Sequence, residues 1–283
     1  MLNDVITNGR VAVVTGGASG IGLAAATAFA ARGMSVAIVD RDEERLEAAA
    51  ATLRDGAPQG VDTTAGFACD VSDEAAVRRL EAAVRERFGK VHLLMNNAGI
   101  QPGSSMFDEP DNWQAVIGVN LWGVINGSRA FAPGMIAHGE PALIINTGSK
   151  QGITTPPGDP AYNVSKAGVK AFTEALEHDL RSRENCRVRA RLLIPGFVFT
   201  GLTARGRTEK PAGAWTPEQT VEFMMERLAA GDFYILCPDN EVDRATDEKR
   251  IQWAADDIVK NRPPLSRWHP DHADAFKEWA RQP

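Results

Sequence analysis

The chain has 283 residues, of which 43% are apolar and 24% charged, and a net charge of −6 at neutral pH. These proportions are typical of globular proteins, the acidic balance disfavours nucleic acid as a partner, and no run of 18 apolar residues predicts a membrane span. Three widely separated cysteines argue against a disulfide framework. We therefore expect a soluble, cytoplasmic protein from a reducing compartment.

Short apolar runs alternate with stretches of helical character along the first 200 residues. Strands are expected over 11–14, 35–39, 92–95, 142–146 and 188–194, with a further strand ending near Asp70. Helices are expected over 21–32, 43–54, 73–87, 113–131 and 162–183. This alternation predicts an α/β fold, a doubly wound parallel sheet with helices on both faces.

The pattern changes after residue 194. Residues 197–215 are expected to form a substrate loop, followed by a helix over 217–230 and a strand over 233–237. A charged tail with three tryptophans and a Pro263-Pro264 break is expected to be helical. Because no linker separates these parts, we predict one catalytic domain over 1–240 and a helical extension of the same domain over 241–283.

A glycine-rich segment, TGGASGIG over residues 15–22, lies directly between the first predicted strand and the first helix. Glycines let the backbone turn tightly and approach a pyrophosphate, while the start of the helix offers free N–H groups and a positive dipole. The alternative is a glycine-rich turn without a ligand. The position at the first strand–helix turn favours a dinucleotide, with predicted contacts at Gly16, Ser19, Gly20 and Ile21.

Asp40 ends the second predicted strand, 18 residues after Gly22. A carboxylate there would accept hydrogen bonds from the adenosine ribose and repel the extra phosphate of NADP, so we predict NAD as the cofactor. The alternative is an aspartate that only starts an acidic turn. Arg41 would lie over the adenine or reach toward a phosphate, and Asp70 and Val71 would flank the adenine unless Asp70 is merely solvated.

Tyr162 and Lys166 are four residues apart, so on a helix they share one face. An ammonium group beside a phenol favours the phenolate and lowers a pKa of about 10, which predicts a general base. Ser149 follows a predicted strand, and its hydroxyl could hold a substrate oxygen. The alternatives are a packed tyrosine with a surface lysine, and an ordinary loop serine.

Several of these motifs occur in the order found in one family. The glycine loop, Asn96-Asn97-Ala98-Gly99, Asn120, Ser149 and the Tyr162–Lys166 pair resemble the short-chain dehydrogenase/reductase family over about residues 8–200. The resemblance implies a Rossmann-like fold, a nicotinamide cofactor, an alcohol or ketone substrate and a homodimer or homotetramer. It also implies that the cofactor contacts these residues: Asn97, Ala98, Gly99, Tyr162, Lys166, Pro195, Gly196, Val198 and Thr200.

Asn120 lies within an apolar helical stripe, where a buried amide is costly unless it finds partners. The family resemblance implies that it holds a water linking Lys166 to solvent. The alternative is a structural amide bonded to neighbouring backbone.

The chain departs from many bacterial family members after residue 232, where a VDGG-like end is missing. Lys150 and Gln151 are more polar than the small apolar residues expected after Ser149, and face either the substrate or solvent. Residues expected to touch the substrate are Gln151, Phe197, Phe199, Leu202 and Trp215.

His269 and His272 suggest a metal site, but two histidines and one aspartate are too few, and we predict none.

Taken together, the motifs predict an NAD-dependent oxidoreductase acting on a small to medium secondary alcohol or its ketone, apolar or aromatic in character. One alternative is a non-catalytic regulator that senses NAD and NADH. Another is a nucleotide-sugar epimerase or dehydratase, although the TGxxGxxG spacing and larger C-terminal domain usual in those enzymes are missing.

Overall fold

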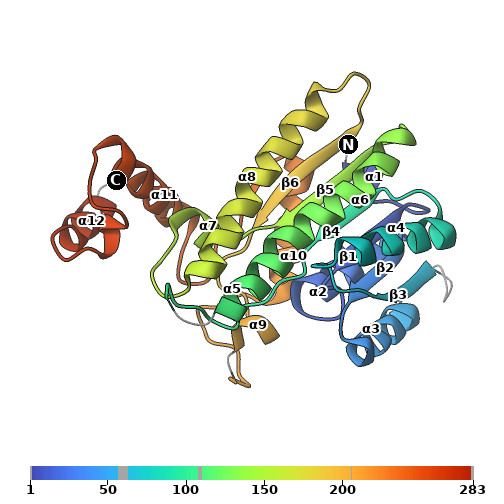
Figure 1. The fold of residues 1–283 in the computed structure, drawn as a ribbon, viewed down its shortest axis with the longest axis horizontal. Coiled ribbons are helices and arrows are strands. Elements are labelled where there is room, and N and C mark those ends of the chain that lie inside the picture. Colours follow the sequence, from blue (N-terminus) through green and yellow to red (C-terminus); the bar gives the residue numbers. More distant parts are fainter. Residues whose placement is uncertain (1, 57–62, 108–109, 205, 282–283) are drawn as a thin grey trace.

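Seven parallel strands form one sheet in the computed structural model, which describes residues 2–56, 63–107, 110–204 and 206–281 (Figure 1). The strand order is β3-β2-β1-β4-β5-β6-β7. The strands are β1 (Val11–Thr15), β2 (Ser35–Asp40), β3 (Thr64–Ala68), β4 (Leu93–Asn96), β5 (Ala142–Thr147), β6 (Val188–Ile194) and β7 (Tyr234–Leu236). The predicted doubly wound α/β fold is confirmed, and its direction of winding reverses between β1 and β4, where such sheets bind ligands.

Helices cover both faces of the sheet. One face carries α2 (Gly20–Ala30), α3 (Glu43–Gly56) and α10 (Pro217–Ala230), and the other carries α4 (Glu74–Phe88), α5 (Pro110–Ile117), α6 (Gly123–Ala137) and α8 (Pro160–Ser182). Phe29 and Met224 lie in the first core layer, and Val84 and Phe131 in the second. Strands buried on both faces explain why their sequences are apolar almost throughout.

The helix predicted over 113–131 is interrupted in the structure. Between α5 and α6 lies one π-helical turn, Gly118–Trp122, in which the Gly123 N–H donates to the Gly118 carbonyl. A π-helical turn adds a residue to the helix and is common at functional sites. Here it contains the fully buried Asn120.

The C-terminal extension continues from β7 as α11 (Arg244–Val259), a 3-10 turn (Ser266–Trp268) and α12 (Ala273–Ala280). Figure 1 shows it projecting from the body beside the short helix α7 (Gln151–Thr154). Trp253 anchors the extension internally, because its ring lies 5.4 Å from the rings of both Phe276 and Trp279. Residue 205 of the predicted substrate loop and residues 282–283 of the extension lie outside the described residues.

Candidate active site

A cavity of about 400 Å³ lies at the carboxyl ends of the central strands. The glycine loop forms one end, and Ser149, Tyr162 and Lys166 line the other. All the residues predicted to contact the cofactor lie on its wall: Gly16, Ser19, Gly20, Ile21, Asp40, Arg41, Asp70, Val71, Asn97, Ala98, Gly99, Tyr162, Lys166, Pro195, Gly196, Val198 and Thr200. Sequence positions nearly 200 residues apart thus meet in one elongated site.

The glycine loop is shaped for close approach. Gly16 has φ +62°, a left-handed conformation that favours glycine, and a Cβ there would lie 2.9 Å from the Ala98 Cα. A Cβ on Gly22 would lie 2.1 Å from the Gly16 carbonyl oxygen. Ser19 is the N-cap of α2, yet its side chain makes no capping bond, so the first N–H groups of the helix face the cavity uncapped. These features suit a phosphate group.

Asp40 lies at the cavity rim where β2 ends. One carboxylate oxygen accepts the N–H of Arg41 at 2.8 Å and of Asp42 at 3.3 Å, and the other accepts that of Ala18 at 3.3 Å. These bonds fix the carboxylate against the glycine loop while leaving acceptor capacity on both oxygens. Its position suits a ribose diol.

Asp70 also lines the cavity, but it is exposed and accepts hydrogen bonds from the backbone and hydroxyl of Ser72 at 2.9 and 2.7 Å. That geometry is a local turn, as the alternative of a solvated aspartate predicts. Asn97, by contrast, ties two loops together, because its N–H donates to the Thr15 hydroxyl at 2.9 Å.

Tyr162, Lys166 and Ser149 meet at the other end of the cavity. The first two lie on the same face of α8, with the Lys166 Nζ 5.7 Å from the centre of the Tyr162 ring. Lys166 donates to the Thr147 carbonyl at 2.8 Å, and Ser149 hydrogen-bonds with the Tyr162 hydroxyl. Two hydroxyl groups and one ammonium group therefore converge where a substrate oxygen could bind.

Burial disfavours the charged forms of both α8 residues. It raises the pKa of Tyr162 to about 12, with the hydrogen bond to Ser149 acting in the opposite direction, and it lowers the pKa of Lys166 to about 8. The net shift of the tyrosine is therefore opposite to the lowering that the sequence predicts. Desolvation is the largest cause of this shift, and the charge of Asp159 acts in the same direction.

The Asn120 side chain is bonded at both ends to the backbone of Ile100. Its Oδ1 accepts the Ile100 N–H at 2.8 Å, and its Nδ2 donates to the Ile100 carbonyl at 2.9 Å. This is the structural amide of our alternative interpretation. It fixes the loop after β4 close to Lys166, since a Cβ on Gly99 would lie 3.4 Å from Asn120 and 3.9 Å from Lys166. The water relay stays a prediction.

The predicted substrate residues are spread more widely. Leu202 lines the cavity, whereas Gln151, Phe197, Phe199 and Trp215 are not part of its described wall. Trp215 packs edge-on against Phe223 of α10 at 5.7 Å, and the Phe197 ring lies 5.7 Å from the Arg207 guanidinium. Gln151 has a buried Oε1 without a hydrogen-bond partner among the described residues. The substrate roles of these four stay predictions.

Further residues that the sequence did not single out also line the cavity, among them Ile100, Gly201 and Thr203. Thr203 donates to the Val198 carbonyl at 2.5 Å and accepts the Thr200 N–H at 3.0 Å, which stabilises the first turn of the loop. The turn belongs to α9 (Gly201–Ala204), a helix too short for hydrophobic periodicity to reveal.

The remaining sequence features concern metal and membrane. The His269 and His272 rings lie 5.7 Å apart, and no cluster of three metal-ligating side chains occurs within the described ranges. Among those same residues, no helix is both long and apolar enough to cross a bilayer.

Comparisons with known proteins agree with this geometry. A family model described as short chain dehydrogenase matches residues 10–211. The chain is 36% identical to a sulfoacetaldehyde reductase of Chromohalobacter salexigens over 225 residues, covering 78% of this chain and 86% of that protein.

Two solved structures are also similar. A short-chain dehydrogenase/reductase from Burkholderia phymatum in complex with NAD has a TM-score of 0.81 and 35% identity, covering 91% of this chain and 96% of that one. An alcohol dehydrogenase from Thermococcus sibiricus complexed with 5-hydroxy-NADP has a TM-score of 0.69 and 30% identity, covering 78% and 90%. The chain belongs to the short-chain dehydrogenase/reductase family.

Proposed function

We propose that this oxidoreductase transfers a hydride between NAD and a secondary alcohol or its ketone. The observation that carries the proposal is the meeting of the Ser149 and Tyr162 hydroxyls beside Lys166, at the end of a cavity whose other end is a phosphate-binding loop. A regulator that only binds the dinucleotide has no need of a tyrosine and lysine buried together at this point.

The chemistry at this end follows from the three side chains. In alcohol oxidation, Ser149 donates a hydrogen bond to the substrate oxygen, and Tyr162 as phenolate takes the hydroxyl proton. The carbon–hydrogen bond breaks as the carbonyl forms, and bound NAD supplies the hydride acceptor. Lys166 favours the phenolate and would hold the nicotinamide ribose. Ketone reduction runs these transfers in reverse, with Tyr162 as the acid.

The preference for NAD over NADP rests on Asp40. A ribose phosphate would approach a carboxylate that the Ala18, Arg41 and Asp42 N–H groups already hold in place. The similar structures include an NAD complex and an NADP-analogue complex, so the family alone does not choose between the cofactors. Like charges about 4 Å apart cost roughly 1–4 kcal/mol at effective dielectrics of 80 to 20, which favours NAD.

The substrate is expected to be small and apolar or aromatic. Besides the Ser149 and Tyr162 hydroxyls, the cavity wall includes the apolar side chains of Ile100 and Leu202. An apolar wall with a few convergent polar groups is typical of a pocket that orients a hydrophobic ligand.

A spectrophotometric screen tests the proposal. The protein is incubated with NAD or NADP and a panel of aliphatic, aryl and anionic secondary alcohols, and absorbance of the reduced nicotinamide is followed. We expect turnover with NAD and an apolar alcohol. Cofactor binding without turnover on any alcohol or ketone would favour the regulator, and conversion of a nucleotide sugar without net NADH would favour the epimerase.

We also propose a homodimer or homotetramer in a reducing, cytoplasmic setting. Trp122 and Val164, on the adjacent π-helical turn and α8, are 49% and 50% exposed and offer an apolar surface for a second copy of the chain. All three cysteines are free thiols. Light scattering of the wild type and of Trp122→Glu tests the assembly, since a buried glutamate would dissociate it.

A further inference from the structure

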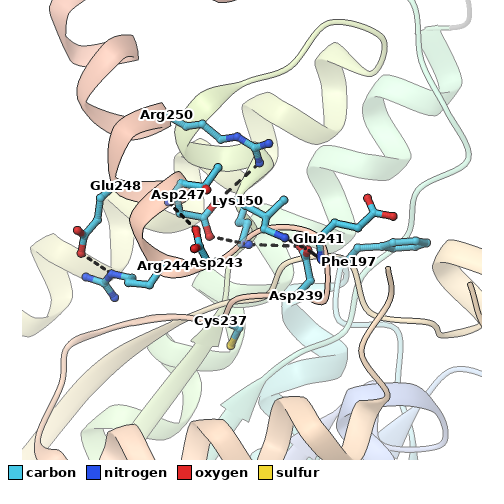
Figure 2. A network of polar contacts seen from close by, with 12 residues as sticks. Lys150, Phe197, Cys237, Asp239, Glu241, Asp243, Arg244, Asp247, Glu248 and Arg250 are labelled. Atoms are coloured by element: carbon cyan, nitrogen blue, oxygen red, sulfur yellow. Dashed lines mark hydrogen bonds and ion pairs between the residues drawn. The ribbon is translucent and has the colours of Figure 1, made fainter. Parts of the chain in front are cut away.

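A buried ionic cluster joins the loop that carries Ser149 and Lys150 to the C-terminal extension (Figure 2). The ammonium group of Lys150, the residue after Ser149, lies 3.3 Å from Asp239 and 2.6 Å from Asp247. The three side chains are 15%, 7% and 5% exposed. The expectation that Lys150 faces either substrate or solvent is therefore wrong: it faces two carboxylates from the segment after β7.

The cluster packs closely around Gly196, one of the glycines on the cavity wall. The backbone N–H of Lys150 donates to the Pro195 carbonyl at 3.2 Å, and its side chain reaches Asp239, whose Oδ2 accepts the Phe197 N–H at 3.2 Å. A Cβ on Gly196 would lie 2.6 Å from Asp239 and 2.9 Å from the Lys150 Nζ. Lys150 thus holds the segment 195–197 from both sides.

The residues after Asp239 hold the other arm of the substrate loop. The Asn240 N–H donates to the Gly213 carbonyl at 3.1 Å, and its side chain donates to Ala212 at 2.7 Å and Ala214 at 3.2 Å. The two arms are also joined to each other, because the Trp215 N–H donates to the Phe197 carbonyl at 2.9 Å. Both ends of the loop over 197–215 are therefore anchored at 239–240.

The charge balance shows what Lys150 contributes. Asp239 and Asp247 lie on opposite sides of one ammonium group, and the next cation, Arg250, is 4.0 Å from Asp247. Burial raises the pKa of Asp247, while Lys150 acts against that shift. Without Lys150, Arg250 would be the one cation still paired with these two buried carboxylates among the described residues, which is strongly unfavourable.

We propose that Lys150 is a positioning residue for hydride transfer, which clamps the Ser149 loop and the segment 195–197 onto Asp239 and Asp247 and so makes the C-terminal extension part of the catalytic unit. This proposal rests on the proposed function. The clamp fixes the spacing between the serine hydroxyl and the wall along which the nicotinamide would lie, and a small error in that spacing slows transfer without removing any reacting group.

Neutralising the clamp tests the proposal. We expect Lys150→Met to lower kcat at least tenfold on the best alcohol of the screen, with the NAD dissociation constant unchanged within threefold. Arg191→Met is the matched control, because Arg191 pairs with Glu177 at similar burial but on β6. Lys150→Met/Asp247→Asn also removes one of the two buried negative charges, so kcat should recover at least threefold.

Hydrogen exchange gives a readout that does not need turnover. The peptide containing residues 195–199 should exchange faster in Lys150→Met than in the wild type or in Arg191→Met, because the Phe197 N–H loses a fixed acceptor. Should Lys150→Met fail to fold, the double variant and Asp239→Asn carry the comparison, and Asp239→Asn should show both the kcat loss and the faster exchange.

The possible outcomes distinguish a failure of the clamp proposal from a failure of the proposed function. A kcat within threefold of that of Arg191→Met, or no recovery in the double variant, would overturn the positioning role. An inactive wild type with faster exchange in Lys150→Met would leave the clamp standing and the proposed function wrong. Unchanged exchange in the variants would overturn the clamp whatever the activity.

Discussion

The two ends of the cavity are built in different ways. At the proposed nucleotide end, wall residues such as Gly16 and Asp40 lie at or just after the end of a strand. At the substrate end, the wall depends on contacts between distant segments, such as Lys150 with Asp239 and Asp247. We therefore expect substitutions at the nucleotide end to change cofactor binding alone. Substitutions at the substrate end should change kcat and the substrate KM, because they also affect the anchored loop.

Replacing Tyr162 by Phe should have the largest effect. The change removes the proton-transfer hydroxyl and keeps the ring, so turnover should fall by about 10²- to 10⁴-fold, while the NAD dissociation constant stays within about threefold. Lys166→Ala should lower turnover and also weaken NAD binding, since the lysine would also hold the cofactor. Steady-state kinetics and NADH fluorescence titration measure the two effects. Activity of Tyr162→Phe within a few-fold of wild type would disprove the mechanism.

The pH dependence of alcohol oxidation should be steep. Burial raises the pKa of Tyr162 to about 12, so the phenolate is scarce at pH 7 and its fraction grows about tenfold per pH unit. We expect kcat/KM to rise from pH 7 to 8 accordingly. Above pH 8 the rise should flatten, because Lys166, with its pKa lowered to about 8, loses the charge that favours the phenolate. A flat profile between pH 6 and 9 would contradict this assignment.

Asp40→Ala tests the nucleotide end. Losing hydrogen bonds to a charged group costs about 1.5–3 kcal/mol, so kcat/KM with NAD should fall at least about tenfold, with a smaller gain for NADP. The KM for the alcohol should not change, because Asp40 is at the far end of the cavity. Asp42→Asn, at the same rim, is the control. A wild type that prefers NADP would overturn the cofactor proposal.

Deleting residues 262–283 should have the smallest effect, and the quantity it changes should be the substrate KM. The deletion removes Phe276 and Trp279 from Trp253 and the Arg262 guanidinium from 3.8 Å above its ring, but it leaves Asp239 and Asp247 in place. A less stable α11 should raise the substrate KM a few-fold and leave NAD binding unchanged. An unaltered KM together with an unchanged oligomer size would remove any role for the tail.

Hydrophobic patterning predicted most of the elements closely. The helix expected over 217–230 is α10 with the same bounds, because a Thr216–Gln219 capping box starts it and Gly231, in a left-handed conformation, ends it. The segment predicted as one helix over 113–131 is helical, but a π-helical turn at Gly118–Trp122 divides it. At the end of this π-helical turn, Gly123 lies so close to Val71 that a Cβ there would be 2.6 Å away, and hydrophobic periodicity does not predict such a contact.

The sequence alone determined the sheet and the glycine loop, because parallel strands bring their carboxyl ends to one edge. It also placed Tyr162 and Lys166 together, because residues four apart share one face of a helix. Tertiary structure alone decided what surrounds those residues. It set the net pKa shift of Tyr162 through burial, bonded Asn120 to Ile100, turned Trp215 toward Phe223 and paired Lys150 with two aspartates. Burial and pairing between segments about 90 residues apart leave no local pattern, since they depend on where the whole chain folds back.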